Sequence, residues 1–295
     1  MHEYIAYGLA IHSEIPLPEL TPRPSARPDV RVHLGGVPEA LDAPLARRAL
    51  WTARPGEWLL EFEGVGRYYV RDGCEIRVEP EGDEADVRAF LFSSTWGALL
   101  HQRGLLVLHA SAVHTPAGAV AVAGKSGAGK STTLARLLER GHILLADDKV
   151  AVIQEDGRPM VVPGYPTVRL WRDALDRMGA PADALPRLRA DLEKYLFRAD
   201  EIRAEPSPLR ALFCLDARSV SEVQVERMEG VEAFQAVYRS TYRNRLVAGF
   251  GMREAHFRRV SALAAVVPVF QVARPHGEDT VGALVEAVEA AVGLP

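Results

Sequence analysis

The sequence predicts a mixed α/β protein, in which a β-rich N-terminal region over residues 1–85 precedes an α/β domain over residues 86–295. Three observations support this fold class. Short β-branched and aromatic runs bounded by Gly, Pro and Asp fill the first region, which is typical of strands and turns. Helical and strand patterns alternate in the second region, as in a sheet covered by helices. A glycine-rich stretch at residues 124–131 joins a strand pattern to a helical one.

Strands and one helix are expected in the first part of the chain. Proline recurs over Pro16–Pro28, which predicts a loop there. Apolar residues at helical spacing predict a helix over Glu84–Arg103, and Gly104 suits the position after its end. The expected strands are Tyr4–Ile11, Val30–Leu34, Trp58–Phe62, Tyr68–Arg71 and Cys74–Val78.

The glycine-rich stretch lies within a strand–helix–strand unit. A strand over Leu105–Val113 is expected to turn at Thr115–Gly118 and to return over Ala119–Ala123. A helix over Lys130–Arg140 and a strand over His142–Ala146 follow. Two strands joined by a crossover helix run parallel, so their carboxyl ends meet at the same edge of the sheet.

Helices and strands continue to alternate in the C-terminal half. The apolar spacing predicts helices at Trp171–Met178, Ala190–Arg198, Val231–Tyr242, Arg253–Ala264 and Asp279–Val292. Runs of β-branched and apolar residues predict strands at Val150–Gln154, Leu209–Leu215, Val223–Met228 and Val267–Val272.

Composition argues against several classes of protein. The net charge of −4 argues against binding of nucleic acid or of an anionic membrane surface. The two cysteines, Cys74 and Cys214, are distant in sequence and are expected to be reduced thiols. No basic segment opens the chain as in a signal peptide. The longest apolar run, Ala262–Ala273, contains Pro268 and is too short for a membrane span. We therefore expect a soluble, cytoplasmic protein.

From Gly124 to Ser131 the chain matches the phosphate-loop pattern G-x-x-x-x-G-K-[ST] in full. Glycines let the backbone N–H groups converge on phosphate oxygens, and the following helix adds its positive end. Lys130 is expected to reach the β- and γ-phosphates, and the Ser131 hydroxyl to hold Mg²⁺. The alternative is an accidental match in a glycine-rich turn. The residues predicted to bind ATP are Gly124, Ser126, Gly127, Ala128, Gly129, Lys130, Ser131 and Thr132.

Two aspartates, Asp147 and Asp148, follow the strand that ends at Ala146. Because parallel strands end at one edge, these carboxylates are expected beside the phosphate loop, where they can meet Mg²⁺ or an acceptor hydroxyl. A general base must lie within hydrogen-bond reach of the proton that it removes, and this placement allows it. Two alternatives stay open: a pair that holds only metal, and a turn rich in aspartate.

The hairpin register brings a histidine into the same region. If His114 faces Ala119, the paired numbers sum to 233, and this register sets His109 opposite Gly124. A histidine at the end of a strand is more often structural than catalytic. Spacing alone therefore leaves the role of His109 open.

Together these segments resemble the catalytic domain of bacterial HPr kinase/phosphorylase. The similar stretches are His109–Val113, the phosphate loop, and Arg140–Asp148 with its R-G-H sequence and aspartate pair. The resemblance covers residues 105–155 and fades on both sides. It implies a phosphate-loop fold similar to that of phosphoenolpyruvate carboxykinase and an ATP- and Mg²⁺-dependent protein serine kinase.

The resemblance also implies roles for single residues. Asp147 would be the general base on the acceptor serine, Asp148 would hold metal or water, and His109 would orient the carboxylates. With Lys130, this makes His109 and Asp147 the expected catalytic residues. Lys149, beside the aspartates, is expected to lower their pKa values.

The chain departs from the family pattern in two places. The family has an E-x-R-G segment whose glutamate helps to hold metal, whereas here Thr167 stands at the glutamate position and Arg169 at the arginine position. A reverse phosphorylase reaction is therefore expected to be weak. The N-terminal region also does not resemble the regulatory domain of the family. The whole looks more like related kinases found beside peptide-modification genes, including those that phosphorylate the C-terminal serine of lasso-peptide precursors.

Arginines are concentrated in one later stretch of the chain. Their planar side chains suit a phosphate or an acceptor carboxylate, and a solvated helix face is the alternative. The cluster comprises Arg239, Arg243, Arg245, Arg253, Arg258 and Arg259.

Three functions are compatible with these patterns. The first is a serine kinase acting on a peptide or protein. The second is a nucleotide-dependent regulatory or scaffold ATPase of a peptide-maturation system, and the third is a kinase of a small hydroxylated molecule. The aspartate pair with His109 favours a kinase over a scaffold. The patterns do not distinguish acceptor size, ATP from GTP, or a monomer from a homo-oligomer.

Overall fold

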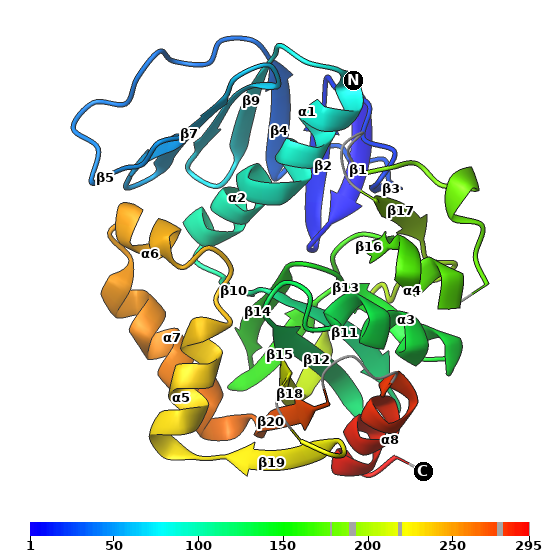
Figure 1. The fold of residues 1–295 in the computed structure, drawn as a ribbon. Helices are drawn as coiled ribbons and strands as arrows, with labels where there is room; N and C mark the ends of the chain where they lie inside the picture. Colours follow the sequence, from blue (N-terminus) through cyan, green and yellow to red (C-terminus); the bar gives the residue numbers. More distant parts are fainter. Residues whose placement is uncertain (178, 189–192, 218–219, 276–279, 295) are drawn as a thin grey trace.

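The computed structural model describes residues 1–177, 179–188, 193–217, 220–275 and 280–294. Two large β-sheets lie at opposite ends of the molecule, and the chain passes from the N-terminal sheet to the second through a long helical segment (Figure 1). Within the described ranges, no helix is both long enough and apolar enough to cross a bilayer.

The N-terminal sheet has nine strands in the order β3-β1-β2-β4-β9-β8-β7-β6-β5. The expected strand over Tyr4–Ile11 is instead a hairpin, because Tyr7 and Gly8 turn the chain with φ of 54° and 70°. The strands are β1 His2–Ala6, β2 Leu9–Ser13, β3 Thr21–Pro22, β4 Val30–Leu34, β5 Ala46–Arg47, β6 Trp51–Arg54, β7 Glu57–Phe62, β8 Gly66–Arg71 and β9 Glu75–Pro80.

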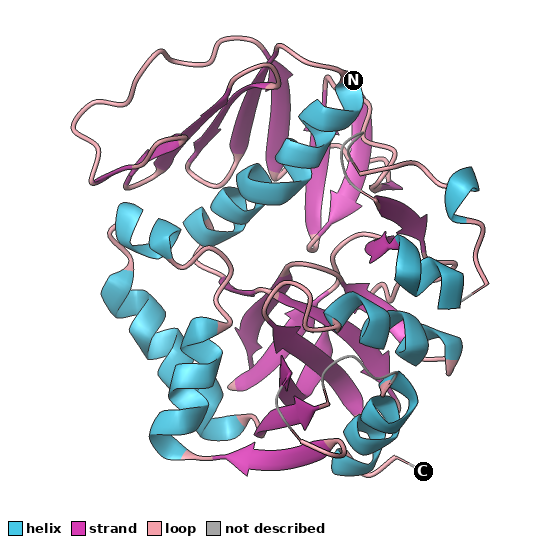
Figure 2. Cartoon of the chain, in the orientation of Figure 1, coloured by secondary structure: helices cyan, strands magenta, loops and turns pink. Residues whose placement is uncertain are grey.

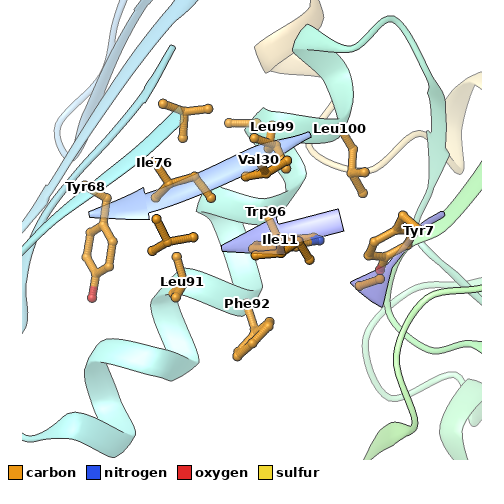
Figure 3. Close-up of a cluster of buried hydrophobic side chains, with 14 of the residues drawn as sticks. Tyr7, Ile11, Val30, Tyr68, Ile76, Leu91, Phe92, Trp96, Leu99 and Leu100 are labelled. Atoms are coloured by element: carbon orange, nitrogen blue, oxygen red, sulfur yellow. The ribbon is translucent and has the colours of Figure 1, made fainter. Parts of the chain in front are cut away.

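One helical segment covers this sheet. It consists of α1 (Glu84–Phe90), a π-helical stretch η1 (Leu91–Thr95) and α2 (Trp96–Gln102), close to the expected bounds. The Asp83 side chain caps its start by accepting two backbone N–H groups. Figure 3 shows how the apolar side chains of this segment and of the strands form one core.

The second sheet carries the phosphate loop. Its strands follow the order β10-β14-β15-β18-β12-β11-β13, and β20 pairs with β18 and β19. The expected single strand over Leu105–Val113 is split at His109 into two strands that join different partners. The strands are β10 Leu106–Leu108, β11 Ala110–Thr115, β12 Gly118–Gly124, β13 Ile143–Ala146, β14 Val150–Glu155, β15 Arg158–Val162, β18 Ser207–Ala217, β19 Gln224–Met228 and β20 Val269–Arg274.

Helices cover both faces of the second sheet (Figure 2). On β12, Val120 and Val122 pack towards α3 and α8, whereas Ala119 and Ala121 pack towards α5 and α7, as the two-residue period of a strand requires. The remaining helices are α3 Lys130–Glu139, α4 Arg172–Arg177, η2 Ala182–Ala184, α5 Gly230–Arg239, α6 Arg245–Gly249, α7 Arg253–Val266 and α8 Val281–Ala291.

The predicted helix over Ala190–Arg198 is wrong. Residues 189–192 lie outside the described ranges, and Lys194–Arg198 is a strand, β17, paired antiparallel with β16 (Thr167–Trp171). Tyr195 of β17 is buried in the same core as Val168 and Leu170 of β16. Pairing with a neighbouring strand therefore outweighs the local helical pattern.

The two regions of the chain share a hydrophobic core. The core of the N-terminal sheet also contains Val107, Ala151, Val162 and Tyr165 from the second region. The tip of the β1–β2 hairpin reaches the second region, where the Tyr7 hydroxyl donates a hydrogen bond to the Lys149 carbonyl at 3.3 Å. The division at residues 85 and 86 stays a prediction about folding units, because packing is continuous across it.

Candidate active site

The phosphate loop connects the end of β12 to the start of α3. Gly127 and Gly129 have φ of 82° and 98°, values that favour glycine. A Cβ atom on Gly127 would have no atom within 4 Å, so the loop faces open space there. No side chain caps the N-terminus of α3, which leaves its first N–H groups available to an anion.

Lys130 begins α3 and lies under the loop. Its ammonium donates hydrogen bonds to the carbonyls of Gly124 at 2.8 Å and Lys125 at 3.2 Å. Burial lowers the pKa of Lys130, while Asp147 and Asp148 act in the opposite direction. Both carboxylates are thus close enough to affect this ammonium.

Arg274 lies against the other side of the loop and was missed in the sequence. It ends β20, and one of its guanidinium nitrogens would lie 3.1 Å from a Cβ atom on Gly129. Its Nε atom is buried and has no hydrogen-bond partner among the described residues. An open cradle of N–H groups beside an unsatisfied guanidinium donor fits the phosphates of a nucleotide.

The strand order differs in one respect from a simple strand–helix–strand unit. Strands β12 and β13 are parallel, but β11 lies between them and runs antiparallel to both. The register pairs Ala110 of β11 with Ala123 of β12, which confirms the predicted sum of 233 for the paired residue numbers of these two strands. On the other side of β11, Ala112 pairs with Ala146 of β13. The start of β11 and the ends of β12 and β13 therefore meet at one edge, as Figure 1 shows.

Asp147 is held rigidly at this edge. Its Oδ1 accepts a hydrogen bond from the Ser111 hydroxyl at 2.7 Å, and its Oδ2 accepts one from the Arg169 backbone N–H at 2.9 Å. The residue is only 6% exposed. Each carboxylate oxygen has two lone pairs, so each keeps one further acceptor position.

Asp148 has a different environment, and its side chain is 21% exposed. Its φ is 66°. Residues 147–149 form a three-residue turn, in which the Lys149 N–H donates a hydrogen bond to the Asp147 carbonyl at 2.8 Å. Such strained turns are rare and are concentrated at functional sites. Its Oδ2 lies 2.5 Å from the Lys149 ammonium and 3.4 Å from Arg169.

These cations keep Asp148 ionised. Burial alone would raise the pKa of Asp148, but Lys149 and Arg169 outweigh burial and hold it well below its usual value. The expected effect of Lys149 on a neighbouring pKa is thus confirmed for Asp148. A carboxylate of this kind is a poor proton acceptor and a persistent negative charge.

His109 lies where β10 ends and β11 begins. Its Nδ1 is 3.9 Å from Asp148 Oδ1, and its backbone N–H donates to the Ser240 carbonyl at 2.6 Å. Burial lowers the pKa of His109 against the opposing effect of Asp148, so the imidazole is neutral at pH 7. The structure places His109 next to Asp148, one residue beyond the last pair of β11 and β12, Ala110 with Ala123.

Tyr242 supports this arrangement and was also missed in the sequence. Its ring stacks on the His109 ring, with centroids 5.7 Å apart and planes 9° apart, and the Lys149 ammonium lies 4.7 Å from its centre. Gly97 of α2 permits this packing, since a Cβ atom there would lie 2.4 Å from the Tyr242 ring. The covering helix thus fixes the ring that contacts both His109 and Lys149.

The segment that differs from the family pattern lies behind the aspartates. The Thr167 hydroxyl donates a hydrogen bond to the Glu19 carbonyl at 3.2 Å. The Arg169 backbone N–H donates to Asp147, and the Arg169 guanidinium donates to Asp148. The Arg169 side chain also donates to the Phe92 carbonyl at 3.1 Å. Arg169 therefore links the aspartate pair to the helical segment that covers the N-terminal sheet. Thr167 offers no carboxylate to a metal.

The R-G-H sequence after α3 has a structural explanation. Arg140 and His142 both contact the carboxylate of Glu289 on α8, at 2.7 Å and 2.9 Å. These contacts attach the end of α3 to α8, on the face of the sheet that the two helices share.

The residues around the loop fit Mg²⁺ in part. No group of three or more His, Cys, Asp or Glu side chains among the described residues could hold a metal ion. Mg²⁺ commonly takes one or two carboxylates with substrate phosphates and water, so a smaller set suffices. Asp148 Oδ1, which faces His109 at 3.9 Å, and the Ser131 hydroxyl are suitable oxygen ligands.

A cavity of about 630 Å³ lies beside the loop. The structure divides the arginine cluster around it: Arg239 and Arg243 line this cavity. Arg258 instead pairs with Glu254 on the exposed side of α7 at 2.9 Å, and Arg259 lies beside Gly104. The cluster is therefore not one site.

Comparison with known proteins gives a limited likeness. No family model matches the chain. One segment of 42 residues is 52% identical to HPr kinase/phosphorylase of Latilactobacillus sakei subsp. sakei (strain 23K), and the match covers 14% of this chain and 13% of that protein. The structure of the Hpr(Ser) kinase/phosphatase from Coxiella burnetii matches with a TM-score of 0.34 and 12% identity, over 63% of this chain and 88% of that one. The chain thus has a partial sequence similarity to HPr kinase/phosphorylase.

Proposed function

We propose that this chain is an ATP- and Mg²⁺-dependent kinase that phosphorylates a serine hydroxyl of a peptide or protein. The observation that carries the proposal is the convergence of the phosphate loop, the aspartate pair and His109 at one edge of the second sheet. A scaffold that only binds the nucleotide needs the loop and a metal ligand, so the second, rigidly held carboxylate and His109 favour a kinase over a scaffold.

In the proposed reaction, the acceptor hydroxyl oxygen forms a bond to the γ-phosphorus. The bond from that phosphorus to the β–γ bridging oxygen breaks, and ADP leaves. The hydroxyl proton passes to Asp147, which we propose as the base because Lys149 and Arg169 hold the pKa of Asp148 well below its usual value and make that carboxylate a poor proton acceptor. The hydrogen bonds from the Ser111 hydroxyl and the Arg169 backbone N–H hold the Asp147 carboxylate in a fixed orientation for this transfer.

The other residues have supporting roles in this proposal. Lys130, the loop N–H groups and Arg274 bind the phosphates, and His109 positions the side chain of Asp148. Asp148 and Ser131 hold Mg²⁺, which supplies positive charge to the phosphate oxygens when bound.

Only the sequence resemblance indicates which class of peptide carries the acceptor serine. We propose a serine in a peptide-maturation system, including the C-terminal serine of a lasso-peptide precursor. The expected location is the cytoplasm, where ATP is available.

The first test is Lys130→Ala, assayed by mass spectrometry of candidate peptides incubated with ATP·Mg²⁺. We expect phosphoryl transfer to be lost, because Lys130 is the cation predicted to meet the β- and γ-phosphates. Arg136→Ala, which removes a cation from the exposed face of the same helix, where it pairs with Glu139 at 2.7 Å, is the matched control and should keep its activity. Wild-type turnover by Lys130→Ala would show that the loop is not the working nucleotide site.

A further inference from the structure

The cavity beside the phosphate loop lies on the opposite face of the sheet from α3. Gly124, Lys125 and Ser126 line it from the loop. Helix α5 forms its wall together with residues 214–216 of β18 and Gln271 of β20. Helices α3 and α5 pack against different faces of β12. The cavity is therefore adjacent to the phosphate cradle at the N-terminus of α3 and distinct from it.

The cavity opens onto the candidate catalytic residues. His109 lines its wall, and the same imidazole lies 3.9 Å from Asp148. The C-terminal end of α5 is fixed at this point, since the Ser240 carbonyl accepts the His109 N–H at 2.6 Å. A molecule in the cavity next to this end of α5 would therefore lie beside His109.

The charges in the cavity wall differ along α5. Glu232 lines the cavity in the first turn of the helix, whereas Arg239 is its last residue and Arg243 follows in the next turn of chain. Arg239 is seven positions after Glu232 on the helix, a rise of about 10 Å. Along α5, the positive end of the cavity wall is thus the end next to His109, while Lys125 and Asp216 add one charge of each sign from the loop and β18.

The two guanidinium groups have no carboxylate partner among the described residues. Arg239 donates to the Gln235 side chain at 3.1 Å, and Arg243 donates to the Tyr242 hydroxyl at 3.4 Å and lies over its ring at 5.7 Å. Arg243 also has φ of 42°, a strained value for an arginine. Other arginines of the described surface, such as Arg136 and Arg258, pair with acidic residues on their own helices.

We propose that this cavity binds the acceptor, and that Arg239 and Arg243 bind a carboxylate carried close to the acceptor hydroxyl. The inference rests on the proposed kinase function and defines the acceptor as an anionic peptide segment. A volume of about 630 Å³ lies within the range of small-ligand pockets, so it holds a short extended segment. The carboxylate is either the C-terminal one of the peptide or that of an acidic side chain next to the serine, because the forked guanidinium binds both alike.

The test uses three synthetic, fluorescently labelled heptapeptides with one serine. The first ends in serine with a free carboxylate, the second is the same peptide with a C-terminal amide, and the third is an amide with glutamate directly after the serine. Binding is measured by fluorescence anisotropy in the presence of ADP·Mg²⁺, and transfer from ATP·Mg²⁺ by mass spectrometry. We expect at least one carboxylate peptide to bind about tenfold more tightly than the neutral amide, the usual effect of a charged hydrogen bond. Which of the two does so identifies the source of the carboxylate.

Variants connect this preference to the two arginines. Arg239→Gln and Arg243→Gln, singly and together, should remove the tenfold preference and leave ADP binding unchanged. Arg245→Gln, an exposed arginine on α6 that does not line the cavity, should keep the preference. Equal binding of all three peptides, or a preference that survives in the double variant, would overturn the inference. Failure of the wild type to bind ADP·Mg²⁺ would instead contradict the proposed function itself.

Discussion

Replacement of Asp147 by asparagine separates the role of this residue in folding from its role in catalysis. The side chain accepts hydrogen bonds from Ser111 and from the Arg169 backbone. Asparagine keeps the shape: its oxygen can accept from Arg169, and its NH₂ group can donate to the Ser111 hydroxyl, which is able to accept. Both hydrogen bonds are retained as neutral ones. Since a charged hydrogen bond exceeds a neutral one by about 1 kcal/mol, the free energy of unfolding should fall by about 2 kcal/mol.

The effect on catalysis should be much larger. An amide cannot take the proton of the acceptor hydroxyl, and loss of a general base typically costs ~10²–10⁴-fold in rate. Nucleotide affinity depends on the loop N–H groups and Lys130, so it should stay near that of the wild type. The measurements are urea denaturation, titration calorimetry with a non-hydrolysable ATP analogue, and single-turnover transfer.

Ser111→Ala is the matched control for Asp147→Asn. It removes one hydrogen bond to Asp147 and keeps the carboxylate, so transfer should fall by far less than in the asparagine variant. A folded Asp147→Asn protein that transfers phosphate at the wild-type rate would refute the assignment of Asp147 as the base. A loss of nucleotide binding in that variant would refute the separation of the two roles.

Two further predictions follow from other parts of the structure. Burial lowers the pKa of His101 to about 4, although its hydrogen bond to the Tyr242 carbonyl opposes this shift. As the pH falls, His101 is therefore protonated in the unfolded chain before it is protonated in the folded one. The free energy of unfolding should fall between pH 6.5 and pH 4 by up to about 3 kcal/mol. Urea denaturation across this range should show a weaker pH dependence for His101→Gln, which can donate the same hydrogen bond without titrating. Arg274→Gln should weaken ADP binding about tenfold in calorimetry, because it removes the cation beside Gly129; unchanged affinity would show that Arg274 has no contact with the phosphates.

The local parts of the fold were predictable from the sequence. The hairpin of β11 and β12 has a short turn and strong β-forming residues, so its register follows from local pairing. The ladder ends at the pair Ala110 and Ala123, so the expected pairing of His109 with Gly124 is not part of it. The helix after the phosphate loop is likewise defined by its glycines and apolar spacing. The strand Lys194–Arg198 was not predictable, because its conformation depends on pairing with β16. The turn at Tyr7 places a non-glycine residue at φ of 54°, and the Tyr7 N–H donates to the Pro163 carbonyl at 2.9 Å, a contact that the local sequence does not indicate.

The same limit applies to the candidate site. The residues of the loop and the aspartate pair are adjacent to recognisable strands, so the sequence brings them together. Tyr242 reaches His109 only because the segment after α5 pairs with β10, and Arg274 reaches Gly129 only because β20 pairs with β18. No periodicity or motif in their own neighbourhoods indicates these contacts.

The position of β11 between β12 and β13 has a consequence for the order of folding. The strand that carries the phosphate loop and the strand that carries the aspartates never pair with each other; each pairs with β11, and both are close to it in sequence. Contacts between nearby segments form faster than those between distant ones, because less chain entropy is lost on closing the loop. We therefore expect the three strands to form an early unit and β18 to join β12 later. Pulse-labelled hydrogen exchange should then show protection of β11 amides before those of β18.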